Sequence, residues 1–236
     1  MADKLRLSVY RFDAEAGRSP YMQDFEVPVT GGHMKLLDAL NHIKWHIDGT
    51  LTYRRSCGEG VCGSDGMNIN GINGLACITP VAGLKQPVKV RPLPGMEVIR
   101  DLVVDTTHFF DQYRMVKPWL QAETPTPEHE RLQQPAERVQ LDGMYECILC
   151  ACCTTSCPSW WWNGNRFLGP AALLHADRWI KDSRDEQTGE RLDQLEDAFR
   201  LYRCHQIMNC MEACPKGLNP TAAIDDIRRR LIARKS

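Results

Sequence analysis

Two cysteine-rich stretches of the same spacing constrain this chain more than any other feature. The first runs from Cys147 to Pro158, with cysteines spaced C-x2-C-x2-C-x3-C-P. The second runs from Cys204 to Pro215 and repeats that spacing, except that Ile207 stands where the second cysteine is expected. Three cysteine side chains with two residues between neighbours can coordinate one compact metal centre from a single turn of the chain. The proline after the fourth cysteine stops that turn, so the fourth side chain is directed elsewhere.

This spacing belongs to ferredoxin motifs, in which the fourth cysteine of each run ligates the other iron–sulfur cluster. The two stretches are therefore predicted to exchange their last ligands. The first cluster takes Cys147, Cys150, Cys153 and Cys214. The second cluster takes Cys157, Cys204 and Cys210. Because Ile207 cannot coordinate iron, the second cube lacks a fourth thiolate and loses one iron readily. We predict a [4Fe–4S] cluster in the first position and a [3Fe–4S] cluster in the second.

A pair of zinc sites is the competing interpretation, because C-x2-C is also zinc spacing. Two matched runs that each end in Cys-Pro favour iron–sulfur clusters instead. The chain has eleven cysteines. These motifs and the one described below account for all of them except Cys152, and they need thiolates, which persist in a reducing compartment. We expect Cys152 to be a small packing residue beside the cluster.

Charge and hydropathy exclude several other classes of protein. The net charge is −1, so the chain has no basic footprint and no nucleic-acid partner is expected. No run of about 18 apolar residues is present, so no segment is expected to cross a bilayer by itself. The chain starts directly with an alternating pattern and lacks the apolar core of a signal peptide. Its length of 236 residues allows one or two domains.

The N-terminal pattern predicts two strands and a helix. Apolar and polar residues alternate over 5–12, which is typical of a half-buried strand, and a second strand is expected near 24–29. A helix face then follows, formed by Leu37, Leu40, Ile43 and Ile47. Gly49 is expected to end this helix. The order strand, strand, helix opens a β-grasp fold.

A third cysteine motif comes next, with the spacing Cys57-x4-Cys62-x2-Asp65-x11-Cys77. It matches the plant-type [2Fe–2S] pattern C-x4-C-x2-C…C, except that Asp65 occupies the third position. An aspartate is an anionic oxygen donor, so we expect Asp65 to be the fourth ligand. In the alternative, Asp65-Gly66 is only a turn pair, and water or another side chain completes the site.

Glycines inside this loop are predicted to let the backbone curl around the cluster and direct N–H groups at its sulfurs: Gly58, Gly60 and Gly63. Beyond the loop, a hairpin of residues 68–73 and 75–79 is expected to carry Cys77, and 88–93 is expected to be a closing strand. Residues 101–104 are expected to extend the sheet. A proline-rich, charged linker is predicted at 123–138.

The predicted fold class is α+β, with a domain boundary near residue 105. Residues 1–105 form an N-terminal β-grasp [2Fe–2S] ferredoxin-like domain, and residues 106–236 form a C-terminal all-α two-cluster ferredoxin-like domain. Helices of the second domain are expected over 108–120, from Pro170, over 192–202 and after Asn219-Pro220. The basic residues 228–234 are expected to be a solvated face, with contact to lipid head groups as the alternative.

The chain carries no nucleophile–base arrangement, phosphate loop or nucleotide fingerprint, so it has the features of an electron carrier without substrate chemistry of its own. Over essentially its whole length it resembles the iron–sulfur subunits of succinate dehydrogenase, respiratory complex II. The resemblance rests on the three cluster motifs with Ile207, on Arg54-Arg55-Ser56-Cys57 and on Cys214-Pro215-Lys216-Gly217-Leu218-Asn219-Pro220. It implies a flavoprotein partner that oxidises succinate at covalent FAD, and two membrane anchor subunits of the cytochrome b type.

The resemblance also implies a route for electrons from FAD through [2Fe–2S], [4Fe–4S] and [3Fe–4S] to ubiquinone, in the tricarboxylic acid cycle and aerobic respiration. It places the chain on the cytoplasmic face of a bacterial inner membrane. The family has a quinone-binding indole at the position of Trp162 and a histidine near that pocket at the position of His205, with Pro158 beside them. Trp160 or Trp161 is expected to pack instead. For His205, a structural hydrogen bond is the alternative.

Three other functions remain open at this point. A quinol:fumarate reductase subunit shares the architecture and runs in reverse, although Asp65, the tryptophan run and His205 resemble the succinate-oxidising branch more. A free-standing ferredoxin-type carrier would not co-purify with a large flavoprotein and membranes. A zinc-binding interaction module would be colourless.

Overall fold

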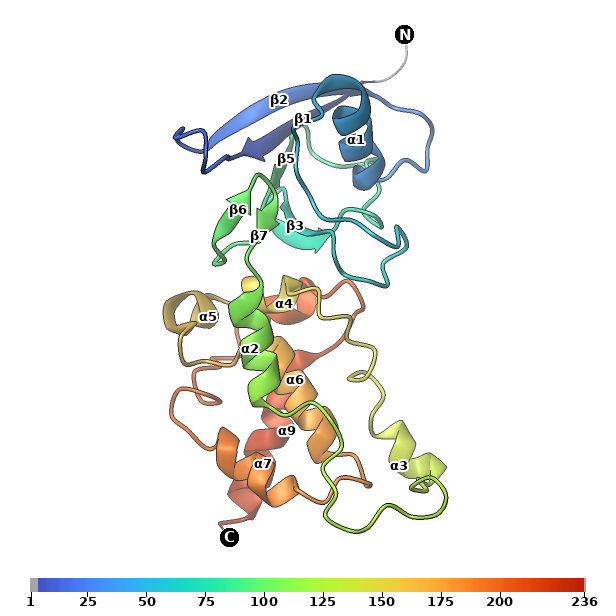
Figure 1. The fold of residues 1–236 in the computed structure, drawn as a ribbon, viewed down its shortest axis with the longest axis vertical. Coiled ribbons are helices and arrows are strands. Elements are labelled where there is room, and N and C mark those ends of the chain that lie inside the picture. Colours follow the sequence, from blue (N-terminus) through green and yellow to red (C-terminus); the bar gives the residue numbers. More distant parts are fainter. Residues whose placement is uncertain (1–3, 236) are drawn as a thin grey trace. The chain divides into compact units, whose positions relative to one another are not determined.

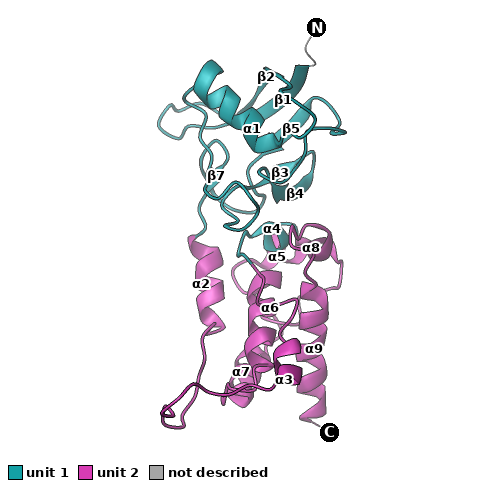
Figure 2. Ribbon diagram, turned by 90° about the vertical axis from the view of Figure 1, so that its right-hand side faces the viewer, with its two compact units in different colours: residues 1–106, 148–156 teal, residues 107–147, 157–236 magenta. Residues whose placement is uncertain are grey.

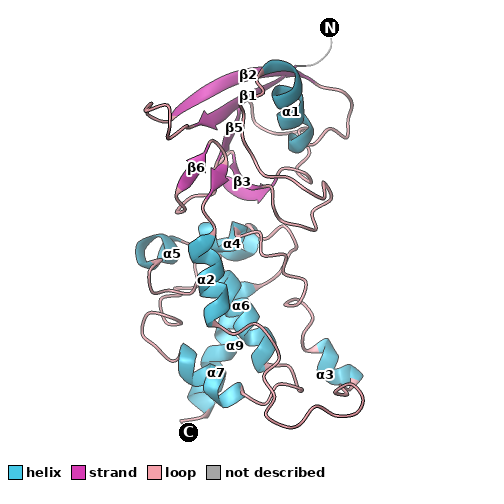
Figure 3. Ribbon diagram, in the orientation of Figure 1, coloured by secondary structure: helices cyan, strands magenta, loops and turns pink. Residues whose placement is uncertain are grey.

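The computed structural model describes residues 4–235, which form two compact units. Unit 1 contains the residues up to 106 together with 148–156, and unit 2 contains residues 107–147 and those from 157 onward (Figure 2). All described strands lie in unit 1, whereas unit 2 is built from helices and loops (Figure 3). The predicted α+β fold class is therefore confirmed. The segment 148–156 groups with unit 1, although the sequence alone assigns it to the second half.

Unit 1 is organised on a five-stranded mixed sheet with the order β2-β1-β5-β3-β4. β1 pairs antiparallel with β2 and parallel with β5, and β3 pairs antiparallel with both β5 and β4. The strands are β1 (Lys4–Arg11), β2 (Tyr21–Pro28), β3 (Gly66–Ile69), β4 (Ile72–Leu75) and β5 (Val88–Arg91). Figure 1 shows helix α1 (Leu36–His42) beside β1 and β5. This arrangement is the expected β-grasp.

Alternation along β1 puts its apolar side chains in the core under α1. Leu5, Leu7 and Val9 of β1 are buried, and so are Leu36 and Leu40 of the helix. Each such side chain contributes roughly 1.5–3 kcal/mol when it is removed from water. The helix and the sheet therefore stabilise each other through one apolar layer.

Helix α1 continues into a π-helical turn, η1 (Ile43–Ile47). Leu37, Leu40 and Ile43 are buried as predicted, but Ile47 is 50% exposed. A π turn takes up extra residues per turn and rotates everything that follows it. The predicted apolar face is therefore wrong at its last member.

Two expectations about strands are corrected. β4 ends at Leu75, so Cys77 lies in the turn after the hairpin, because its N–H donates to the side chain of Asp65. β6 (Val98–Arg100) and β7 (Val103–Val104) pair with each other in a separate two-stranded sheet and do not extend the main one. Asp101 between them has a positive φ of 46°, which reverses the chain at that point.

Buried polar contacts hold the segment that leads into the first cysteine loop. The Arg11 Nε donates to Asp101 Oδ1 at 3.0 Å, and Asp101 Oδ2 accepts the N–H of Thr52 at 2.8 Å. The Arg54 guanidinium donates to the Val104 carbonyl at 2.7 Å. Removing one partner of a buried ion pair costs about 3–5 kcal/mol. The chain therefore enters the Cys57 loop from a fixed position.

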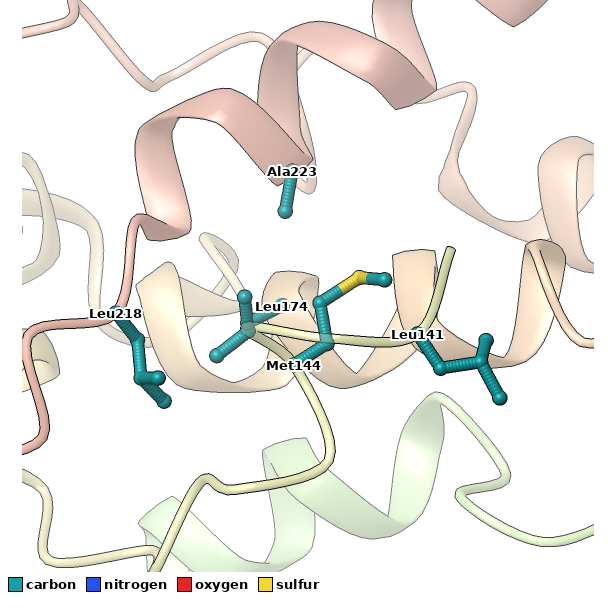
Figure 4. Close-up of a cluster of buried hydrophobic side chains, with 5 residues drawn as sticks. All are labelled: Leu141, Met144, Leu174, Leu218 and Ala223. Atoms are coloured by element: carbon teal, nitrogen blue, oxygen red, sulfur yellow. The ribbon is translucent and has the colours of Figure 1, made fainter. Parts of the chain in front are cut away.

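Unit 2 has its core between two long helices. The helices of this unit are α2 (Thr107–Met115), α3 (Pro135–Val139), α5 (Pro158–Asn163), α6 (Gly169–Ile180), α7 (Thr188–Leu195), α8 (Asn209–Glu212) and α9 (Pro220–Ala233). α4 (Cys152–Thr155) belongs to unit 1. α6 packs against α9. Figure 4 shows the buried cluster at this seam, formed by Leu141, Met144, Leu174, Leu218 and Ala223.

Two helices of unit 2 end earlier than predicted. α2 stops at Met115, before Pro118, and Lys117 already has a positive φ of 47°. α7 stops at Leu195, because the Asp197 side chain accepts the N–H groups of Phe199 and Arg200 at 2.8 and 3.1 Å. Such a local bond competes with the helical ladder.

The other helix boundaries follow the sequence more closely. Pro170 lies in the first turn of α6. Asn219 Oδ1 accepts the N–H of Ala222 at 2.9 Å and caps α9, with Pro220 at its start, as predicted. The C-terminal part of the predicted linker forms the short helix α3.

Candidate iron–sulfur centres

The loop that begins at Cys57 directs backbone N–H groups at the Cys57 sulfur. Glu59, Val61 and Cys62 donate to it over 3.4, 3.4 and 3.3 Å. These bonds stabilise the thiolate and lower the pKa of Cys57 to about 7. Positive φ angles make the curl possible at Gly58, Gly60 and Gly63. The loop therefore favours a thiolate, the form that binds iron.

Asp65 lies at the buried end of the same loop, with only 2% of its surface exposed. Its Oδ2 accepts the N–H of Cys77 at 2.6 Å, so the two predicted ligands meet although they are twelve positions apart. Burial, followed by the hydrogen bond and the charge of Asp65, raises the pKa of the Cys77 thiol to about 12. A bound iron cation would take the place of the thiol proton and would stabilise the Cys77 thiolate next to Asp65. If Asp65-Gly66 were only a turn pair, it would need no contact with Cys77, twelve positions along the chain. Ligation of iron by Asp65 stays a prediction.

The donors of this first centre suit a cluster. Within residues 4–235, no three cysteine, histidine or acidic side chains converge as ligands of a single metal ion would. A [2Fe–2S] cluster divides its four ligands between two irons, so its ligands need not converge on one point. Cys57 and Cys62 are exposed, whereas Asp65 and Cys77 are buried. One edge of the centre is therefore open to solvent in this chain.

The first of the two matched turns carries a strained backbone around Cys150. Leu149 and Ala151 have positive φ angles of 53° and 63°. α4 follows immediately and contains Cys153, which is buried. Left-handed non-glycine residues cost roughly 1–2 kcal/mol each and persist where the surroundings hold them. Cys152 is fully buried, as expected of a packing residue.

The predicted ligands of the [4Fe–4S] cluster are divided between the units. Cys150 and Cys153 belong to unit 1. Cys147 and Cys214 both pack against the apolar cluster of unit 2. The N–H of Leu218 donates to Cys214 Sγ at 3.4 Å, which is a typical bond to a ligand sulfur. The set of four stays a prediction.

The second matched turn repeats the backbone of the first. Gln206 and Met208 have positive φ angles of 52° and 71°, and they flank Ile207 as the left-handed pair flanks Cys150. α8 then contains Cys210, as α4 contains Cys153. Ile207 therefore occupies the conformational position of Cys150, and its side chain offers iron no donor.

The three predicted ligands of the second dicluster centre line one cavity in unit 2: Cys157, Cys204 and Cys210. The cavity contains about 320 Å³ of space not filled by atoms, part of it open to solvent. Ile207 also lines it. Burial raises the pKa of the Cys157 and Cys210 thiols. Three thiolates and an apolar fourth side chain around one cavity fit a cube that lacks one iron.

Two hydroxyl groups at this cavity are not indicated by the sequence motifs. Thr221 Oγ1 lies 3.3 Å from Cys210 Sγ. Ser159 is buried and lines the cavity, and its hydroxyl interacts with the Cys157 thiol, whose pKa it lowers against the larger raising effect of burial. Each of the two hydroxyls therefore lies beside a predicted ligand sulfur, Ser159 beside Cys157 and Thr221 beside Cys210. In the sequence, only its position directly after Cys157-Pro158 could have indicated that Ser159 lies near the cluster site.

The tryptophan run divides between packing and exposure. Trp160 is 3% exposed, and its Nε1 donates to Gln112 Oε1 at 2.8 Å, so it packs as expected. Trp162 is 74% exposed and is not among the residues that line the cavity. Pro158 and His205 do line it. The structure therefore brings two of the three predicted quinone residues to the cavity and leaves the third on the surface of unit 2.

Comparisons with known proteins agree with these centres. The family described as "2Fe-2S iron-sulfur cluster binding domain" matches residues 6–111, and the family described as "4Fe-4S dicluster domain" matches residues 143–218. These matches favour iron–sulfur clusters over the zinc interpretation. The chain also resembles, in its fold, a chain of the Mycobacterium smegmatis Sdh1 complex in the apo form, with a TM-score of 0.87 and 25% identity. That alignment covers 100% of this chain and 98% of the other.

Close relatives by sequence carry one name. The succinate dehydrogenase iron–sulfur subunit of Paracoccus denitrificans is 56% identical over 97% of this chain and 88% of its own length. The mitochondrial succinate dehydrogenase [ubiquinone] iron–sulfur subunit 1 of rice, Oryza sativa, is 53% identical over 97% of this chain and 82% of its own length. With both cluster-binding families matched and with relatives this similar over 97% of its length, the chain belongs to the family of succinate dehydrogenase iron–sulfur subunits.

Proposed function

We propose that electrons cross this chain from the FAD of a flavoprotein subunit through [2Fe–2S], [4Fe–4S] and [3Fe–4S] clusters to ubiquinone. The chain is the electron-transfer subunit of a succinate dehydrogenase, and it holds a [2Fe–2S] centre and a 4Fe-4S dicluster domain. The protein's own residues ligate the clusters, exclude water from them and position them. The clusters supply the one-electron chemistry.

The observation that carries this proposal furthest is the repeated turn. The left-handed residues around Ile207 match those around Cys150, so the two turns have the same conformation with one donor fewer. A [3Fe–4S] cluster at Cys157, Cys204 and Cys210 follows from that missing donor. This cluster would be the last of the three, because Pro158 and His205, two of the three residues proposed for the quinone, line its cavity.

The quinone end of the chain is proposed at Pro158, His205 and Trp162. Pro158 and His205 line the cavity with the ligands of the last cluster. The exposed indole of Trp162 can donate its N–H to a quinone carbonyl, and His205 can hold a proton for transfer to the reduced quinone. Because Trp162 lies on the surface, the pocket would be completed by partner subunits.

The donor end is proposed at the exposed edge of the [2Fe–2S] loop. Cys57 and Cys62 are exposed there, and so are the apolar side chains of Val61 and Ile78. Exposed apolar groups beside a redox centre suit a protein partner, which would be the flavoprotein subunit. Docking on this edge would bring a flavin close to the first cluster.

Membrane attachment is proposed through two anchor subunits of the cytochrome b type. None of the helices in the described part of the chain is long and apolar enough to cross a bilayer. Several basic side chains near the C-terminus form ion pairs with acidic groups of this chain: Arg229, Arg230, Arg234 and Lys235. These pairs support the solvated-face interpretation over contact with lipid head groups. We propose the cytoplasmic face of a bacterial inner membrane as the location.

Low-temperature EPR of the intact complex tests this function. We expect a three-iron signal in the oxidised protein, and [2Fe–2S] and [4Fe–4S] signals after reduction. Two cubane signals without a three-iron signal would contradict the role of Ile207. Quinol-driven fumarate reduction faster than succinate-driven quinone reduction would instead assign the complex to the fumarate reductase branch.

A further inference from the structure

The [2Fe–2S] loop touches the turn that carries Cys150, and it does so through glycines. A Cβ at Gly63 would lie 2.8 Å from the Cβ of Cys150, 3.0 Å from its Cα and 3.0 Å from the Ile148 carbonyl oxygen. A Cβ at Gly66 would lie 2.9 Å from the Cys150 carbonyl oxygen and 3.5 Å from Cys152 Sγ. Both segments belong to unit 1. The backbones therefore approach to a distance that leaves no room for a side chain.

A buried hydrogen-bond network holds the same turn from its other end. Asn73 in β4 is buried, and its Nδ2 donates to the Cys152 carbonyl at 3.1 Å and to Thr155 Oγ1 at 3.0 Å. Its Oδ1 accepts from Asn68 Nδ2 at 2.8 Å, which fixes the orientation of the amide. Thr155 in turn donates to the Ala151 carbonyl at 2.8 Å. A network in which every member is satisfied is rigid, and the loss of one member leaves the others unpaired.

These contacts make one hairpin the support for two centres. β3 and β4 begin directly after Asp65 and end just before Cys77, which are predicted ligands of the [2Fe–2S] cluster. The same hairpin holds the turn that supplies Cys150 and Cys153. Gly63 directly follows Cys62, a predicted ligand of the [2Fe–2S] cluster, and it packs against Cys150, a predicted ligand of the [4Fe–4S] cluster. The two sets of predicted ligands are therefore connected through Gly63.

We propose that Gly63, Gly66 and Asn73 are positioning residues that set the spacing between the [2Fe–2S] and [4Fe–4S] clusters. This inference rests on the proposed function, because it uses the cluster order given there. The rate of electron tunnelling falls steeply with distance, so a turn displaced by a side chain would slow transfer between the first two clusters. The requirement explains why a segment of the dicluster motif packs with the ferredoxin unit.

Alanine substitutions at three glycines of this region distinguish the effect of the close backbone contact from the effect of backbone strain. Gly66 has no positive φ, so Gly66→Ala adds the clash and little else. Gly58 has a φ of +77° and nothing within 4 Å of its added Cβ, so Gly58→Ala adds strain without the clash. Gly74 in β4 has neither feature, and its Cβ would meet other atoms only at 3.9 and 4.0 Å. Gly74→Ala is therefore the neutral control in the same hairpin.

The experiment is pulsed EPR on the intact complex, purified with its partner subunits and fully reduced. The spin relaxation of the [2Fe–2S] cluster reports its distance from the paramagnetic [4Fe–4S] cluster, since their dipolar coupling falls with the third power of that distance. We expect Gly66→Ala to slow this relaxation several-fold while all three clusters stay present. Gly74→Ala should match the wild type, and Gly58→Ala should change the [2Fe–2S] spectrum and leave the enhancement intact.

Wild-type relaxation in a fully loaded Gly66→Ala complex would overturn the proposal. Asn73→Ala provides a second route if Gly66→Ala does not assemble, and it should slow the relaxation or lose only the [4Fe–4S] signal. Loss of the [2Fe–2S] signal as well in both variants would show that these residues support the whole unit, which also contradicts the proposal. A wild-type complex without [2Fe–2S] and [4Fe–4S] signals would instead refute the proposed function.

Discussion

The turns at Cys147–Pro158 and Cys204–Pro215 share a backbone and differ in what that backbone offers to iron. Each has two left-handed residues, then a helix of four residues, then Cys-Pro. Cys150 stands between the left-handed residues of the first turn, and Ile207 between those of the second. The turn thus keeps its conformation without the second thiolate. The conformation of the turn therefore does not depend on the second cysteine. The number of cysteine ligands is what distinguishes the clusters proposed for the two turns.

The surroundings of the two turns also differ. The first is packed against the β3–β4 hairpin, with Cys152 buried and Asn73 bonded to its carbonyl. The second lines a cavity, and Ile207 is 47% exposed. The first turn is therefore held in a fixed position within unit 1, whereas the second keeps an open side, which suits its proposed place as the last centre before the quinone.

Replacement of Ile207 by cysteine tests the comparison most directly. Ile207→Cys restores the missing donor in a turn of the right conformation, so we expect the three-iron EPR signal of the oxidised complex to disappear and a second [4Fe–4S] signal to appear on reduction. Ile207→Val, which adds no donor, should retain the three-iron signal. An unchanged three-iron signal in Ile207→Cys would mean that the two turns are not equivalent.

Removal of the exposed indole tests the open side of the second turn. Trp162→Ala is expected to lower quinone reduction by roughly 2- to 10-fold, since a lost hydrogen bond between two neutral groups costs about 0.5–1.5 kcal/mol. Succinate oxidation with an artificial dye should stay near the wild-type rate. His205→Ala should show the same split if it serves the quinone, whereas equal loss of both activities would assign a structural role.

The seam between α6 and α9 supports the second turn through Thr221, and it contains a buried carboxyl. Lys181 lies 2.8 Å from Asp177 and 3.5 Å from Asp226, and burial raises the pKa of Asp177 to about 7. The pKa in the folded protein is above the unfolded value near 4, so folding retains the proton and stability falls as the pH rises from about 4 to 7.

We therefore expect Asp177→Asn to stabilise unit 2 at about pH 8 by an amount on the order of 1–4 kcal/mol, with a smaller effect at about pH 5. The measurement is the temperature at which the three-iron signal is lost on heating the intact complex at each pH. Asp225→Asn on α9 is the control: it removes only the solvent-accessible ion pair with Arg229, so it should change stability by no more than about 0.5 kcal/mol at either pH. A wild-type temperature that rises over this pH range would contradict the sign.

The hydroxyl of Thr221 should produce the smallest effect. A hydrogen bond to a ligand sulfur stabilises the reduced, more negative cluster, so Thr221→Val is expected to lower the midpoint potential of the three-iron cluster by tens of millivolts, where about 59 mV corresponds to a tenfold change for one electron. Ser159→Ala should act in the same direction. EPR potentiometry checks both, with the other two clusters as internal references. A shift of all three potentials would point to a general structural change.

Much of the candidate site follows from local spacing. Thiolates two residues apart, a proline after the last cysteine and glycines in the Cys57 loop act within a few residues of one another, so the chain itself specifies them. The strands β1, β2 and β5 and the asparagine cap of α9 are predictable for the same reason. The missing fourth ligand at Ile207 is also predictable, because this one residue interrupts an otherwise identical cysteine spacing.

What the local pattern leaves open is settled by contacts between distant residues. Asn73 bonds a carbonyl 79 positions away, and no motif marks it. Cys77 leaves the strand because Asp65 takes its N–H, and Ile47 turns outward because a π turn rotates the end of the helix. The sequence by itself determines the spacing of the predicted ligands, because the positions of the cysteines along the chain are fixed by covalent bonds. The tertiary structure decides which unit carries each turn, because close backbone approach and buried hydrogen bonds exist only after folding.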